Sequence, residues 1–280
     1  MPCGRATKPS NSMMSCWAFP PSTRAAEFDE QWSFVAKKEK NCDRSREEDA
    51  RCGDCWDHLA YDPEHRLVVS VVCGRRTEDL TFQLVADFHE RTGGRVMDLM
   101  MSDEYSVYAA AILEIYGVEV VPARTGRPGR PPQPHKEVPE ELTYATVHKE
   151  REGGRVVSVE TRVVYGTEEA VAAALESLDI GEKVNTAHEE RFHGTDRNRN
   201  ARKVRKAYTF SKDWEVHVAV TKFVRYSYNF CWPVRTLRVR GESGSWEART
   251  PAMSAGLTNH VWSLREWLTL PSVKRTREAA

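Results

Sequence analysis

FDEQWSFVAKK at residues 28–38, CWDHLAYD at residues 55–62 and RLVVSVVCGRR at residues 66–76 are the stretches that decide the fold. Each is short, rich in β-branched and aromatic residues, and bounded by charged or turn-forming residues, as strands are. Pro63 lies between the second and third stretches, where it favours a turn. The three stretches therefore predict successive strands.

Helices and a further strand follow. Apolar residues recur at helical spacing from Thr77 to Arg91, and the glycines just beyond end this helix. RVMDLMMSD at residues 95–103 predicts a fourth strand, and a second helix is expected over residues 106–116. This order of elements predicts an α/β (α+β) fold in which helices flank a mixed sheet.

The middle of the chain predicts an insertion at about residues 121–180. ARTGRPGRPPQPHKEVPEE at residues 123–141 is rich in proline and predicts a basic linker; a minor-groove hook built on its two GRP units is the alternative. Residues 142–166 predict a hairpin that turns at Gly153 and Gly154, and a short helix capped by Thr167 follows.

Three regions are therefore expected. Residues 1–26 lack periodicity and predict a disordered leader, residues 27–240 form the core with its insertion, and residues 241–280 form a tail anchored by Trp262 and Trp267.

Aromatic residues of the core are expected to pack inside it. The segment 211–230 predicts a helix that packs on the sheet rather than one that stacks on bases. Its expected apolar face consists of Val216, Val220, Phe223 and Tyr226. Trp32 and Phe34 are expected in the core of their strand.

Charge is unevenly distributed along the chain. Formal net charge is zero over the 280 residues, but residues 191–240 contain thirteen Lys or Arg against three Asp or Glu, which is 13 − 3 = +10. Such a segment is typical of surfaces that contact phosphate backbones. The basic residues expected to bind DNA are Arg191, Arg197, Arg199, Arg202, Lys203, Arg205, Lys206 and Lys212.

The composition also indicates the compartment. No apolar stretch approaches the roughly 20 residues of a membrane span, and the N-terminus has no signal-peptide core, so a cytoplasmic protein is expected. Seven cysteines, an odd number, favour reduced thiols. A zinc site built on the CxxC of Cys52 and Cys55, with Cys42 and His58 nearby, is a weaker alternative, because a second ligand pair is missing.

Three acids far apart in sequence are candidates for a metal site: Asp29, Asp103 and Glu190. Divalent cations such as Mg²⁺ take oxygen ligands, and two of them can serve phosphoryl transfer with only two or three carboxylates. Neighbouring acids leave two choices open, Asp29 or Glu30 and Glu189 or Glu190. His193 could join Glu190 as an ExxH pair, although a histidine on the helix surface is the plainer interpretation.

Seven motifs resemble, in the right order, the DDE transposases of bacterial insertion sequences, of the insertion sequence 1 type. They cover most of residues 27–270 and are FDEQWSFV, GDCWDHLAYDPEHRLVVSVVCGRRT, MSDEYSVY, NTxxxER, FSKDW, YNFCWPVRTLR and TPAMSAGLTNHVWS. The resemblance implies an RNase H-like catalytic core with Asp29, Asp103 and Glu190 as the metal-binding acids and Arg197 as the basic residue seven positions after the glutamate.

The resemblance also implies an activity and partners. It implies DNA cleavage and strand transfer at transposon ends, two Mg²⁺ (or Mn²⁺) ions, double-stranded DNA as the substrate, and assembly of several copies on that DNA. The N-terminal DNA-recognition module usual in this family has no counterpart before Phe28. A truncated remnant that only binds DNA and a structure-specific RNase H-like nuclease are the alternatives.

Overall fold

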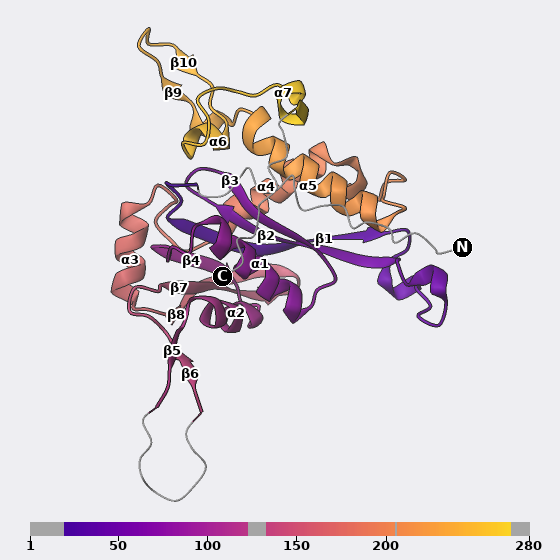
Figure 1. The fold of residues 1–280 in the computed structure, drawn as a ribbon, viewed down its shortest axis with the longest axis horizontal. Helices are drawn as coiled ribbons and strands as arrows, with labels where there is room; N and C mark the ends of the chain where they lie inside the picture. The colour runs from indigo at the N-terminus through magenta and orange to yellow at the C-terminus, as the bar shows by residue number, and fades with distance from the viewer. Residues whose placement is uncertain (1–19, 123–132, 205, 270–280) are drawn as a thin grey trace, which may run out of the picture.

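The structure is a computed structural model that describes residues 20–122, 133–204 and 206–269. Its centre is a six-stranded sheet with the strand order β3-β2-β1-β4-β7-β8 (Figure 1). The strands of this sheet are β1 (Ala25–Val35), β2 (Gly53–Asp62), β3 (Leu67–Gly74), β4 (Leu99–Asp103), β7 (Tyr144–Glu152) and β8 (Arg155–Tyr165).

The sheet is mixed. Strands β1, β2 and β3 form an antiparallel meander, whereas β4 pairs parallel with β1 on one side and with β7 on the other. Strand β8 closes the sheet as an antiparallel edge. The predicted α+β class and the first four predicted strands are confirmed, and the arrangement is compatible with an RNase H-like fold.

Helices cover both faces of the sheet, because side chains of alternate strand residues point to opposite faces. The long helices are α1 (Glu78–Arg91), α2 (Val107–Tyr116), α3 (Glu168–Ser177), α4 (Ala187–Arg199) and α5 (Trp214–Cys231). One core joins the sheet to α1 and α2, with Phe28, Phe88 and Tyr108 at its centre. On the opposite face, two further cores lie under α3 and under α4 and α5. Within the described ranges, no helix has the length and apolarity that a bilayer crossing requires.

Part of the expected insertion belongs to the core sheet. The hairpin predicted over residues 142–166 is present, but its first strand, β7, pairs with β4 from Met100 to Asp103 and so extends the sheet beside Asp103. The helix capped by Thr167 is confirmed: its hydroxyl accepts a hydrogen bond from the Ala170 amide at 3.1 Å.

The short strands β5 (Val118–Val120) and β6 (His135–Glu137) form a separate hairpin that extends away from the sheet (Figure 1). The two GRP units, within residues 123–132, lie outside the described residues.

Both ends of the described chain are tied to the core. The boundary predicted after residue 26 is wrong, because β1 already begins at Ala25. Residues 1–19 of the predicted leader lie outside the described range. The tail contains β9 (Val239–Arg240), β10 (Trp246–Glu247), α6 (Pro251–Ser254) and α7 (Leu264–Thr269). The expected aromatic anchors are confirmed, since Trp262 and Trp267 both pack on the Phe230 ring.

The buried face of α5 is aromatic near its C-terminus, where the expected Tyr226 and Phe223 pack in the core, but it is polar over its first half. Its inward residues include His217, Thr221 and Arg225, all fully buried, whereas Val216 is 43% exposed. The spacing of apolar residues does not predict this part of α5, because its inward side chains pack against buried charged residues instead of apolar ones.

Those charges form a water-free network of four side chains. Lys203, from the short helix η4 (Ala201–Lys203), contacts Asp57 of β2 at 2.5 Å and Asp196 of α4 at 2.9 Å. Arg225 contacts the same two carboxylates at 3.4 and 3.3 Å. Burial opposes ionisation of Asp57, but the charges of Lys203 and Arg225 outweigh it and lower its pKa. Since the Lys203 side chain is fully buried, its predicted role in binding DNA is wrong.

We predict that Lys203→Met lowers the free energy of unfolding by about 3–5 kcal/mol, because removing one partner of a buried ion network leaves charge uncompensated. The exposed Lys183→Met is the control and should change stability by less than about 0.5 kcal/mol. Urea denaturation measures both. Equal stabilities for the two variants would contradict the network.

Candidate active site

The candidate site forms where β1 and β4 part. The two strands pair in parallel only from Ala25–Leu99 to Phe28–Ser102, and the next residues along the strands are Asp29 and Asp103. Where two neighbouring strands stop pairing, the sheet opens between them. Both acids lie at this opening, so their side chains can reach solvent while their backbones remain part of the sheet.

Three carboxylates meet at this point. Oxygen atoms of Asp29, Glu30 and Asp103 all lie within 4.8 Å of one another. Backbone amides fix two of them: the Glu30 amide donates to Asp29 at 2.7 Å, and the Tyr105 amide donates to Asp103 at 3.1 Å. The cluster could therefore hold a metal ion through oxygen ligands.

Glu30 and Asp29 differ in their surroundings. Glu30 accepts hydrogen bonds from the Tyr108 hydroxyl at 2.7 Å and from Arg76 at 2.9 Å, and its side chain is 1% exposed. The Asp29 side chain is 20% exposed. These contacts favour Asp29 as the ligand that faces a substrate, with Glu30 supporting it from inside.

The acids of the cluster lie close enough together to affect one another's ionisation. Burial raises the pKa of Asp29 to about 7 together with the charges of Asp103, Glu30 and Glu190, against the opposing effect of the hydrogen bond from the Glu30 amide. Glu190 is therefore close enough for its charge to act on Asp29. Of the three acids chosen from the sequence, Asp29 and Asp103 meet in the cluster, whereas Glu190 of α4 is not among the acids whose oxygen atoms meet there and pairs with Lys149.

Helix α4 is attached to β1 by a second, buried acid. Glu27 accepts a hydrogen bond from the Glu189 amide at 2.9 Å and contacts the His188 imidazole at 2.8 Å. Amides in the first turn of a helix have no partner within the helix, and a carboxylate there satisfies them. Glu27 thus sets where Glu190 lies relative to Asp29, a role that sequence reasoning missed.

Glu189 and Glu190 point into different environments. Glu190 is 54% exposed and pairs with Lys149 of β7 at 2.5 Å. Glu189 is fully buried, and neither of its carboxylate oxygens has a hydrogen-bond partner among the described residues. Burial, together with the charges of Asp29 and Glu27, raises the pKa of Glu189 well above its usual range and so favours its protonated form. Glu190 is the better candidate for a metal ligand.

His193 lies between two acids rather than on the helix surface. Its Nδ1 is 3.6 Å from Asp29 and its Nε2 is 3.8 Å from Glu189. Burial, with the nearby charges of Arg225 and Arg197, lowers the pKa of His193 well below its usual range, so the ring is neutral. The surface placement preferred from the sequence is wrong.

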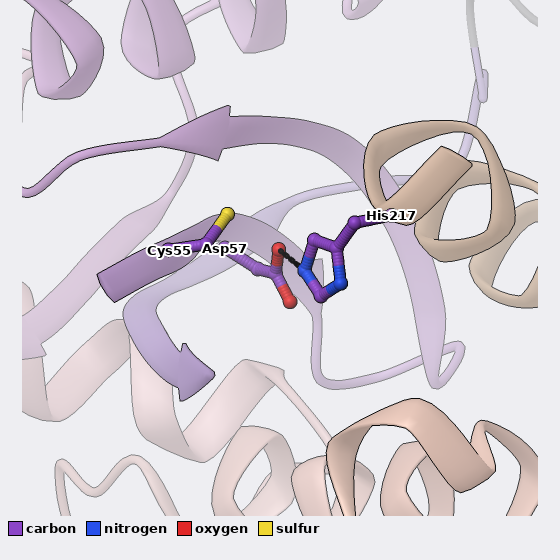
Figure 2. A group of neighbouring side chains, drawn as sticks. All are labelled: Cys55, Asp57 and His217. Atoms are coloured by element: carbon purple, nitrogen blue, oxygen red, sulfur yellow. Dashed lines mark ion pairs between the residues drawn. The ribbon is translucent and has the colours of Figure 1, made fainter. Parts of the chain in front are cut away.

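A second group, Cys55, Asp57 and His217, also has ligand atoms within 4.8 Å of one another (Figure 2). Its chemistry does not suit a cation. Both His217 nitrogens already lie within hydrogen-bond distance of serine hydroxyls, at 2.7 and 3.1 Å, and two buried cations contact Asp57. Burial raises the pKa of the Cys55 thiol, which stays protonated. The group belongs to the core network. In the described ranges, the weaker zinc alternative around Cys52 does not assemble.

The basic residues predicted to bind DNA have different surroundings. Arg191, Lys206 and Lys212 are exposed, and Arg197 and Arg202 are partly exposed. Arg199 stacks on the Trp232 ring at 3.5 Å. Arg205 lies outside the described residues.

No protein-family model matches the chain, and no curated protein is significantly similar to it. The resemblance to DDE transposases therefore stays an expectation, and the geometry of the chain itself carries the functional argument.

We predict a pH-dependent stability difference between the wild type and Asp29→Asn. A raised pKa means that folding favours the protonated acid, so the contribution of Asp29 is full below about pH 4 and is lost as pH rises through 7. Relative to the variant, the wild type should lose about 2–3 kcal/mol of unfolding free energy between pH 5 and 8. Urea denaturation in EDTA measures it, with the exposed Asp179→Asn as the control. A constant difference would show that Asp29 titrates normally.

We also predict that Glu190→Gln and Glu189→Gln differ strongly in their rates of metal-dependent DNA cleavage. Glutamine resembles a protonated glutamate, so Glu189→Gln should keep metal-dependent DNA cleavage within about threefold of wild type, which is under 1 kcal/mol. Glu190→Gln removes a charged candidate ligand and should lower the cleavage rate by roughly 100-fold or more. The reverse order would exchange the two roles. Circular dichroism checks that both variants fold.

Proposed function

We propose that the protein is a DDE-type transposase that cleaves DNA and joins the cut ends to target DNA with the help of divalent cations. The observation that carries the proposal is the convergence of Asp29 and Asp103 where β1 and β4 part, with the charge of Glu190 acting on Asp29 from α4. Asp29 and Asp103 are 74 positions apart (103 − 29) and meet because their strands are neighbours in the sheet.

The carboxylate cluster suits Mg²⁺ or Mn²⁺. Its ligand atoms are hard oxygens, which both ions accept, and its like charges raise the pKa of Asp29, so a cation would relieve the repulsion. When bound, two such ions would activate the attacking hydroxyl and stabilise the leaving oxyanion. Asp29, Asp103 and Glu190 would hold them.

The residues around the cluster orient it and attract the substrate. Tyr108 and Arg76 hold Glu30, and Glu27 holds the first turn of α4. Exposed cations of the segment after Glu190 would contact phosphates of double-stranded DNA, and several copies would assemble on it. A cytoplasmic location, where such DNA lies, is part of the same proposal.

Two experiments test the proposal with the full chain. Nicking of supercoiled plasmid in Mg²⁺ or Mn²⁺, absent in EDTA, is expected. A labelled duplex with a free 3′ hydroxyl should also become joined to the plasmid, which a nuclease would not do. Nicking without joining would favour the nuclease alternative, and DNA binding without nicking would favour the inactive remnant.

We predict that Asp103→Asn lowers cleavage by roughly 100-fold or more while DNA affinity stays equal or rises, since the change removes a candidate ligand and a charge that repels phosphate. The matched control is Glu104→Gln, the adjacent exposed acid, which contacts His148 and Arg162 instead of the cluster. It should cleave within a few-fold of wild type. Equal losses in the two variants would remove Asp103 from the site.

A further inference from the structure

A groove opens along β1 beyond the candidate site. Strand β4 accompanies β1 only to Phe28, and the segment between α4 and α5 runs beside the rest of β1. Backbone contacts fix the far end of that segment: the Ala36 amide donates to the Ser211 carbonyl at 2.7 Å. Between the strand and the segment lies a groove of 570 Å³. In Figure 1, this part of β1 extends with β2 beyond the neighbouring strands.

Aromatic rings form one wall of the groove. The rings of Trp32 and Phe34 lie 5.8 Å apart, and Phe210 lies 4.9 Å from Phe34, so the three make a continuous row. Tyr208 also lines the groove and is 97% exposed. The expectation that Trp32 and Phe34 belong to the strand core is wrong, since both are only half-buried and face this opening.

Cations accompany the rings. Lys38 lies over Trp32 and Phe34, at 5.7 and 5.8 Å from their ring centres, and Arg202 and Lys206 line the opposite side. Among the described residues, no aspartate or glutamate lines the groove. The surface therefore combines exposed aromatic faces with uncompensated positive charge.

This combination suits one class of partner. Proteins bind single-stranded nucleic acid by stacking bases on aromatic rings while cations follow the phosphates. A duplex keeps its bases stacked internally, so the rings would have no base to meet, and a free phosphate would not use them either. An acidic peptide would pair only with the cations of the groove, and an apolar peptide would contact only its rings.

We propose that this groove binds a single-stranded segment of DNA. The inference rests on the proposed function for its choice of DNA, and it adds a substrate feature, namely unpaired nucleotides a few positions from the cleaved phosphate. Trp32 and Phe34 follow Asp29 by three and five strand residues, which corresponds to about 10–17 Å. At roughly 3.4 Å per nucleotide of a stacked strand, the groove would hold nucleotides about three to five positions from the candidate site.

The test measures binding in EDTA, so it needs no catalysis. Fluorescence anisotropy would compare a labelled 12-nucleotide oligo(dT) with a duplex of the same length, using the full chain carrying Asp103→Asn. We expect oligo(dT) to bind with quenching of tryptophan fluorescence. Tyr208→Ala should weaken it by roughly 5- to 100-fold, the range for loss of one stacked base. Duplex affinity should change less than twofold.

Matched variants exclude a general loss of folding. Trp32→Phe should remove most of the quenching while circular dichroism stays unchanged, whereas Trp246→Phe, in the exposed hairpin of the tail, should keep it. Lys206→Ala should reduce the slope of log affinity against log salt by up to ~0.7. Unchanged oligo(dT) affinity in Tyr208→Ala, or equal losses on duplex, would overturn the proposal. Neither result affects the cleavage assays, so the two proposals fail separately.

Discussion

Two carboxylates and two cations, all excluded from water, hold one side of this molecule together. Asp57 comes from β2, Asp196 from α4, Lys203 from η4 and Arg225 from α5, so the network joins the sheet to the two helices that cover this side of it. Arg225 also hydrogen-bonds Gln31 of β1, two residues beyond Asp29. Buried ions tolerate little displacement, because each needs its partners at contact distance. The position of α4 and the course of the segment along the groove both follow from this constraint.

The candidate site uses several acids in different states. Glu27 satisfies the amides of a helix start, Glu30 is held by a tyrosine and an arginine, and Glu189 is buried where its protonated form is favoured. Of these acids, Asp29, Asp103 and Glu190 are the ones that reach solvent. Neighbouring acids of the same type thus acquire distinct roles through burial and hydrogen bonding, not through their intrinsic chemistry.

Local patterns were sufficient for the first four strands, the hairpin of β7 and β8, and the helices α1, α2, α3 and α5, because apolar periodicity reflects which side of an element is covered. They missed the short strands, including β6 inside the predicted linker. They also singled out Asp29 and Asp103, whose oxygen atoms meet in one cluster, and Glu190, which stays a prediction. The choice between Asp29 and Glu30 needed the contacts of Arg76 and Tyr108. The buried face of α5 and the burial of Lys203 could not be predicted. A buried charge is stable only when residues from distant segments pair with it. The local sequence around the charge does not show which residues these are. The aromatic groove could not be predicted for the same reason, because it is open only where β4 no longer pairs with β1.

The contacts that complete the site connect distant parts of the chain. Glu27 meets His188 and Glu189 across 161 and 162 positions, and Gln31 meets Arg225 across 194. Closing such long loops is an entropic cost that precedes any gain from the contacts, and folds dominated by them form slowly. The meander of β1, β2 and β3 can form early during synthesis, whereas the attachment of α4 and α5 to β1 must wait until both helices have been synthesised. An incomplete chain therefore carries the meander without the contacts that attach α4 and α5 to β1.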